Sequence, residues 1–133
     1  MVTKQSTVYV IDDDESVRRA FARLLRSANL NVETFPSTQA FLESPKQGTG
    51  ACIVMDIRMP DESGFDLQRK LAASGITLPV LVVSAGDETV IRDHARALGA
   101  AAFFRKPVDD QALLDAIWWA ISGAGETTRN KDG

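Results

Sequence analysis

The chain has 133 residues, of which 44% are apolar and 25% charged, a balance typical of one soluble globular domain. With 18 acidic against 15 basic residues its formal net charge is -3, which gives no overall attraction for DNA or an anionic membrane. No apolar run approaches the roughly 18 residues of a membrane span, and the opening MVTKQST lacks the apolar core of a signal peptide. We therefore expect a cytoplasmic protein that contacts no membrane.

Short apolar runs alternate with longer segments of helical periodicity along the chain. The expected strands are Thr7–Ile11, Asn31–Phe35, Ala51–Asp56, Pro79–Ser84 and Ala101–Phe104. The expected helices are Ser16–Ala28, Ser37–Ser44, a segment from Ser63 or Phe65 to Ala73, Asp87–Leu98 and Asp109–Ser122. Their inward stripes are predicted to be Val17, Ala20, Phe21, Leu24 and Leu25; Ala40 and Phe41; Val90, Ile91, Ala95 and Leu98; and Leu113, Ile117 and Ile121.

Five strand–helix units are too few for an eight-stranded barrel. They predict an α/β domain, (βα)5, in which helices cover both faces of an open, doubly wound parallel sheet. This domain is expected to span residues 1–122, and the small and polar residues 123–133 to form a flexible tail or the start of a linker.

In such sheets, ligands bind beyond the carboxyl ends of the strands. The residues at that edge are Asp12 and Asp13, Asp56, Ser84 and Lys106. Clustered carboxylates repel one another unless a hard cation lies among them, and Mg²⁺ suits oxygen ligands of this kind. A hydroxyl, an ammonium and a central carboxylate nucleophile would complete a site for phosphoryl transfer. Each residue alone is more often a cap or a surface group, but all four strand ends deliver compatible chemistry.

The four acids of YVIDDDESV fall into two groups. Asp12 and Asp13 finish the strand and are the candidate cation pair. Asp14 and Glu15 are predicted to lie in the first turn of the next helix, where a favourable interaction with its N-terminus explains them. The lone Cys52 is expected to be a buried small hydrophobe, and the lone His94 a solvated surface residue without a zinc site.

Four stretches resemble the receiver domain of two-component response regulators, over Thr7 to about Ser122: VIDDDESVR, VMDIRMPDESGFDLQRKL, LPVLVVSA and LGAAAFFRKPVDDQALLDAI. DIRMPDESGFDLQ also resembles the FixJ-like branch. The resemblance implies the flavodoxin-like strand order 2-1-3-4-5. It also implies that a sensor histidine kinase phosphorylates Asp56 with Mg²⁺, for which Mn²⁺ substitutes, and that the domain is no enzyme beyond self-catalysed transfer and autodephosphorylation.

Further roles follow from the resemblance alone. It implies the Arg58 backbone carbonyl as another metal ligand, Lys106 as the phosphate contact, and a cis Lys106–Pro107 bond. Ser84 and Phe103 match the switch pair, whose movement alters a face formed by residues 87–122. Ala85, where the FixJ-like loop differs, leaves an open path to the phosphoryl group.

The sequence disfavours two functions other than a phosphorylation switch. A Mg²⁺-dependent phosphatase would need an Asp-x-Asp-x-Thr motif after the first strand, and DDDES lacks it. A degenerate binding module is disfavoured because all key positions are intact. The chain is expected to control transcription through an output domain that it lacks, which alone would contact DNA; the alternative is a stand-alone regulator acting through protein contacts.

The consecutive Trp118 and Trp119 depart from the FixJ-like pattern. They lie about 100° apart on a helix, so at least one should be partly exposed. One interpretation is that both tryptophans pack over the edge of their own domain. The other is an anchor for an output domain or for a homodimer that forms on phosphorylation.

Overall fold

The computed structural model describes residues 6–44, 50–57, 64–75, 77–86 and 89–122, and the side chains of 64 and 65 are not described. The strands are β1 (Thr7–Ile11), β2 (Asn31–Phe35), β3 (Ala51–Asp56), β4 (Val80–Ser84) and β5 (Ala102–Arg105). The helices are α1 (Glu15–Ser27), α2 (Thr38–Leu42), α3 (Gly64–Ser74), α4 (Thr89–Ala97) and α5 (Asp110–Ile121). The predicted alternation is confirmed, with bounds that differ by one or two residues at most ends.

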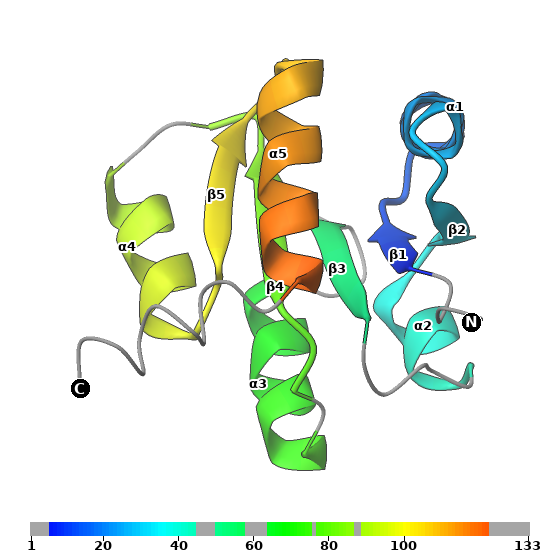
Figure 1. The fold of residues 1–133 in the computed structure, drawn as a ribbon. Coiled ribbons are helices and arrows are strands. Elements are labelled where there is room, and N and C mark those ends of the chain that lie inside the picture. The colour runs from blue at the N-terminus through cyan, green and yellow to red at the C-terminus, as the bar shows by residue number, and fades with distance from the viewer. Residues whose placement is uncertain (1–5, 45–49, 58–63, 76, 87–88, 123–133) are drawn as a thin grey trace.

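The five strands form one parallel sheet in the order β2-β1-β3-β4-β5, and helices lie on both sides of it (Figure 1). The chain passes from β1 to β2 on one side and then crosses back to β3 on the other side of β1. This reversal places the carboxyl ends of β1 and β3 at the topological switch point, where open sheets bind ligands. The predicted doubly wound fold and strand order are therefore confirmed.

The sheet separates two hydrophobic cores, which explains why its central strands are apolar on both faces. Buried side chains of α1 and α5 pack with alternate residues of the strands on one side: Ala22, Leu25, Val8, Val10, Cys52, Val54, Leu81, Val83, Leu113, Ile117 and Ala120 belong to this cluster. Buried side chains of α2, α3 and α4 form the other: Phe41, Leu67, Leu71, Ala95, Tyr9, Ile11, Ile53, Met55 and Val82 belong to it.

Side-chain caps set the starts of three helices. Asp14 accepts hydrogen bonds from the Ser16 and Val17 amides at 2.8 and 3.3 Å, so it is the N-cap of α1. The prediction placed Asp14 in the first turn, one position too late; Glu15 does lie there. Ser37 and Asp109 cap α2 and α5 in the same way. These bonds satisfy amides that would otherwise lack partners.

Two positions of the predicted inward stripes are wrong. Ala20 is exposed and Ala22 is buried, while the predicted Phe21, Leu24 and Leu25 do face the core, so the buried stripe of α1 includes Ala22 in place of Ala20. Val90 is 77% exposed at the first turn of α4, where Ala95 and Ile91 provide the contacts with the core. A short helix is held by few contacts, so its apolar residues do not all define its buried face.

Candidate functional site

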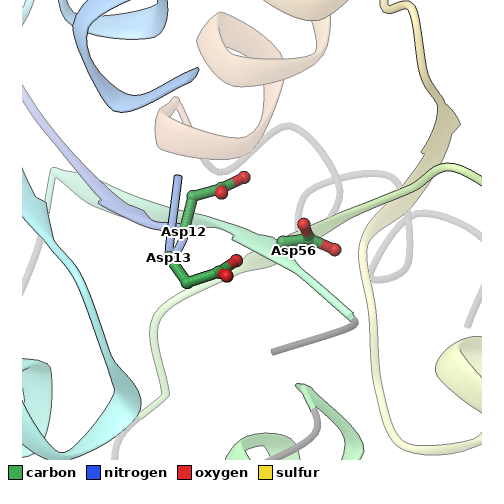
Figure 2. Close-up of side chains that lie close together, drawn as sticks. All are labelled: Asp12, Asp13 and Asp56. Carbon is green, nitrogen blue, oxygen red and sulfur yellow. The ribbon is translucent and has the colours of Figure 1, made fainter. Parts of the chain in front are cut away.

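The carboxyl edge of the sheet brings together the five polar residues predicted for it. Asp12 follows β1 directly, Asp56 is the last residue of β3, Ser84 is the last residue of β4, and Lys106 follows β5. Oxygen atoms of Asp12, Asp13 and Asp56 all lie within 4.8 Å of one another. Figure 2 shows these three carboxylates converging from two neighbouring strand ends. We call them the acid pocket.

Lys106 joins the two buried members of the acid pocket. Its Nζ donates to Asp56 Oδ2 at 3.0 Å and to Asp12 Oδ2 at 3.3 Å. The other oxygen of Asp12 accepts the Asp14 amide at 2.9 Å. Because Asp12 is 2% exposed and Asp56 is 9% exposed, one ammonium compensates two largely buried carboxylates. Asp13, in contrast, is exposed.

The ionisation of the pocket reflects this burial. Loss of hydration raises the pKa of the Asp12 carboxyl above its usual range, although the Asp14 amide and Lys106 act in the opposite direction. Burial by itself would lower the pKa of Lys106, but the hydrogen bond to Asp56 and the charges of Asp12 and Asp56 together raise it. The site therefore holds more negative charge than its internal cation stabilises.

A hard cation fits this arrangement. Three carboxylates offer only oxygen donors, which Mg²⁺ and Ca²⁺ prefer and which zinc sites rarely use alone. Two oxygens bound directly to one Mg²⁺ lie at most about 4.2 Å apart, given metal–oxygen distances of about 2.1 Å. The oxygens of the acid pocket lie within 4.8 Å of one another, close enough for one ion to be held by all three carboxylates, directly or through its waters.

The hydroxyl of Ser84 lies at the same edge, and among the described contacts it acts only as an acceptor. Ser84 is fully buried, and its Oγ accepts the Gly86 amide at 3.1 Å. The hydroxyl hydrogen can therefore be donated to another group. On the neighbouring strand, Phe103 pairs in register with Val82 and is partly buried against the core that lies between the sheet and α2, α3 and α4.

Two further predictions, for the Lys106–Pro107 bond and for Cys52, can be compared with the structure. The Lys106–Pro107 peptide bond is cis, as expected. Arg58 lies outside the described residues, as does Ser63, one of the two predicted starts of the third helix. Cys52 is buried, and burial raises the pKa of its thiol to about 12, so this cysteine is a core residue rather than a nucleophile.

One residue at the site was missed by the sequence analysis. The guanidinium of Arg18, on α1, donates from Nη1 to the backbone carbonyl of Asp12 at 2.7 Å. Arg18 ends the stretch VIDDDESVR, but no role was predicted for it, because it is one of several arginines in an amphipathic helix. Only its position four residues after the N-cap Asp14, which turns it back toward the end of β1, distinguishes it from its neighbours.

The two tryptophans lie away from the acid pocket on α5. Trp118 is 42% exposed and Trp119 is 48% exposed, while Leu113 and Ile117 are fully buried. The expectation that at least one tryptophan is partly exposed is confirmed.

Among the helices of the described segments, none has the length and apolar character that a membrane crossing requires.

Comparisons with known proteins agree with this geometry. Residues 8–118 match the family described as response regulator receiver domain. Response regulator protein TmoT of Ectopseudomonas mendocina is 38% identical over 130 residues, which are 98% of this chain and 59% of TmoT. Transcriptional regulatory protein TdiR of Thauera aromatica is 41% identical over 117 residues, 88% of this chain and 52% of TdiR. The chain thus spans little more than half of these relatives.

A solved structure has the same fold over nearly its full length. The crystal structure of FixJ-N superposes with a TM-score of 0.82 and 32% identity, covering 90% of this chain and 96% of that one. The resemblance to the FixJ-like branch is therefore supported in both sequence and structure.

Proposed function

This chain belongs to the response regulator receiver domain family, and from that premise we propose that a sensor histidine kinase phosphorylates it on Asp56 in a Mg²⁺-dependent reaction. Receiver domains of transcriptional regulators are not conventional enzymes. The catalysis proposed is confined to the domain's own phosphorylation and dephosphorylation.

The proposed transfer is a single displacement at phosphorus. A carboxylate oxygen of Asp56 attacks, its bond to phosphorus forms, and the bond from phosphorus to the histidine nitrogen of the donor breaks. The leaving nitrogen keeps the electron pair of the broken bond, and one proton taken up from solvent makes the departing imidazole neutral. Lys106 is within 3.0 Å of Asp56, so it can move with the carboxylate to contact the phosphoryl oxygens. Ser84 supplies a hydroxyl donor to another of these oxygens.

The carboxylates Asp12, Asp13 and Asp56 would hold the ion, with the Arg58 carbonyl proposed as a further ligand. Bound Mg²⁺ supplies positive charge that offsets the repulsion between these acids and the incoming phosphoryl group. Lys106 and the acid pocket alone carry one positive charge against three negative ones. This imbalance is the observation that supports the proposal best.

The proposed signal is a rearrangement of Ser84 and Phe103. Ser84 would move toward the phosphoryl group, and Phe103 would rotate into the space vacated. Because β4 carries Ser84 beside β5, the change would reach α4, β5 and α5, the surface that the output uses. The printed name of TdiR and the greater length of the relatives favour transcription as that output, with any DNA contact made by another domain. A stand-alone regulator acting through protein contacts is the alternative.

Mass spectrometry tests the phosphorylation. Acetyl phosphate with Mg²⁺ should add one phosphoryl group to the wild type and none to Asp56→Asn. Asp93→Asn, which alters an exposed acid on α4, is the matched control and should be modified like the wild type. Omitting Mg²⁺ should suppress the modification of both the wild type and Asp93→Asn. Modification of Asp56→Asn at the wild-type rate would rule the assignment out.

A further inference from the structure

Arg18 makes a contact that its neighbours on α1 do not make. Its Nη1 lies 2.7 Å from the carbonyl oxygen of Asp12, and the bond is partly buried. A hydrogen bond from a guanidinium is charge-assisted and stronger than one between neutral groups. The bond also connects two parts of the fold, since Arg18 belongs to α1 and Asp12 directly follows β1.

The carbonyl of Asp12 belongs to the peptide group that links Asp12 to Asp13. A peptide group is planar, so a hydrogen bond that holds its oxygen restricts rotation of the plane that contains the two Cα atoms. Those Cα atoms carry two of the three carboxylates of the acid pocket. Arg18 thus restrains the direction in which both side chains leave the backbone.

Lys106 does not restrain the backbone between Asp12 and Asp13. It contacts the carboxylate oxygens of Asp12 and Asp56, and no hydrogen bond joins it to Asp13 among the described contacts. Asp13 is exposed and is repelled by the other two acids, so nothing in the side-chain contacts of Lys106 keeps it near them. A restraint on the backbone at Asp12 and Asp13 would keep the Asp13 carboxylate near the other two.

Arg19 shows what an ordinary arginine on this helix does. It pairs with Glu15 at 2.8 Å, one helical turn away, and both side chains are about 70% exposed. Such pairs contribute little to stability. The two adjacent arginines therefore differ in that only Arg18 reaches the loop that carries the acid pocket.

We propose that Arg18 is a positioning residue of the metal site, which orients the peptide between Asp12 and Asp13 so that both carboxylates face one cation. This inference rests on the proposed Mg²⁺ binding at the acid pocket. It goes beyond it by assigning a role to a residue that is neither a ligand nor a contact of the phosphoryl group.

Isothermal titration calorimetry with Mg²⁺ alone tests the proposal. Arg18→Gln should weaken Mg²⁺ binding roughly tenfold, as is typical when a residue that orients a ligand is lost. Arg18→Lys retains a charged donor and should lose clearly less. Arg19→Gln, the matched control, should remain within about twofold of the wild type, because its ion pair does not touch the loop.

A second measurement separates positioning from general stability. The Asp14 amide donates to Asp12 Oδ1 at 2.9 Å, so its hydrogen exchange without metal reports the order of this loop. Arg18→Gln should accelerate that exchange and leave the core amides of β3 unchanged. Equal Mg²⁺ affinities in Arg18→Gln and Arg19→Gln, or acceleration across all core amides, would overturn the proposal. A wild type that fails to bind Mg²⁺ would overturn the proposed function as well.

Discussion

At the carboxyl edge of the sheet, charged side chains are buried and paired, whereas on α5 large apolar side chains are exposed. Asp12 and Asp56 are nearly inaccessible, while Trp118 and Trp119 are 42% and 48% exposed. Both arrangements oppose the usual preference for apolar groups inside and charges outside. Each of the two arrangements therefore lowers the stability of the fold, and packing of the domain alone does not explain why it is present.

The two regions differ in where their partners lie. The acid pocket has an internal partner, Lys106, whose ammonium bridges two carboxylates. The tryptophans belong to the helix surface, where an interface would have to come from another molecule or another part of the protein. Changes at the carboxyl edge should consequently have large effects on the isolated domain, and changes on α5 should have small ones.

Lys106→Met should have the largest effect on stability. It would leave Asp12 and Asp56 close together without a counter-charge, at a cost of roughly 1 to 3 kcal/mol near neutral pH, less than for a fully buried pair because Lys106 is 26% exposed. Urea denaturation without metal measures this loss. In the Asp12→Asn background, Lys106→Met should cost less, and equal costs in both backgrounds would show that the bridge is not the source.

Asp12→Asn should change how stability depends on pH. The pKa of Asp12 is raised by burial above its ordinary value of 3.8, so the folded state holds this proton more tightly than the unfolded state. This residue's contribution to metal-free stability therefore falls as pH rises from about that value through the folded pKa, and then stays constant. Melting temperatures from pH 4 to 7 should show a stability gain for Asp12→Asn over the wild type that grows with pH. A constant difference would contradict it.

Asp13→Asn and Glu15→Gln should have smaller and opposite effects. Without Mg²⁺, Asp13→Asn removes repulsion in the acid pocket and forfeits no contact with Lys106, so its melting temperature should rise. The Arg19 contact lowers the pKa of Glu15, so Glu15→Gln should leave the melting temperature unchanged or slightly lower. In the presence of Mg²⁺, Asp13→Asn should instead have a lower melting temperature than the wild type, because the variant has lost a metal ligand. Equal shifts from both variants would remove the distinction between cation ligand and helix-terminal acid.

The carboxyl edge could be predicted from sequence because backbone geometry dictates it. Parallel strands end at the same side, so the residue after each apolar run has a known place before any contact is known. Asp12, Asp56, Ser84 and Lys106 were located in this way. Arg18 could not be, because its role depends on a side chain reaching from a helix back to a carbonyl, and helical periodicity does not specify that.

Predictions for helix faces were less complete for a related reason. The periodicity of α1 predicts correctly that Leu25 is buried, but it predicts burial of Ala20 where Ala22 is the buried residue. Alanine is small enough to suit either environment. Val90 was assigned inward from its hydrophobicity, yet it lies at the first turn of α4 and is exposed. Burial at a helix end depends on what packs against it, and the pattern of one helix does not contain that information.

The tryptophans should have the smallest effect on the isolated domain and a conditional effect on assembly. Trp118→Ala and Trp119→Ala should change the free energy of unfolding far less than truncation of the buried Leu113 or Ile117, because each tryptophan already leaves more than two fifths of its surface exposed. We expect sedimentation equilibrium to show a larger mass with beryllofluoride and Mg²⁺ than without them, and at least one of the two variants to reduce that increase. If the wild-type mass is the same in both conditions and neither substitution alters it, these side chains pack only over the edge of their own domain.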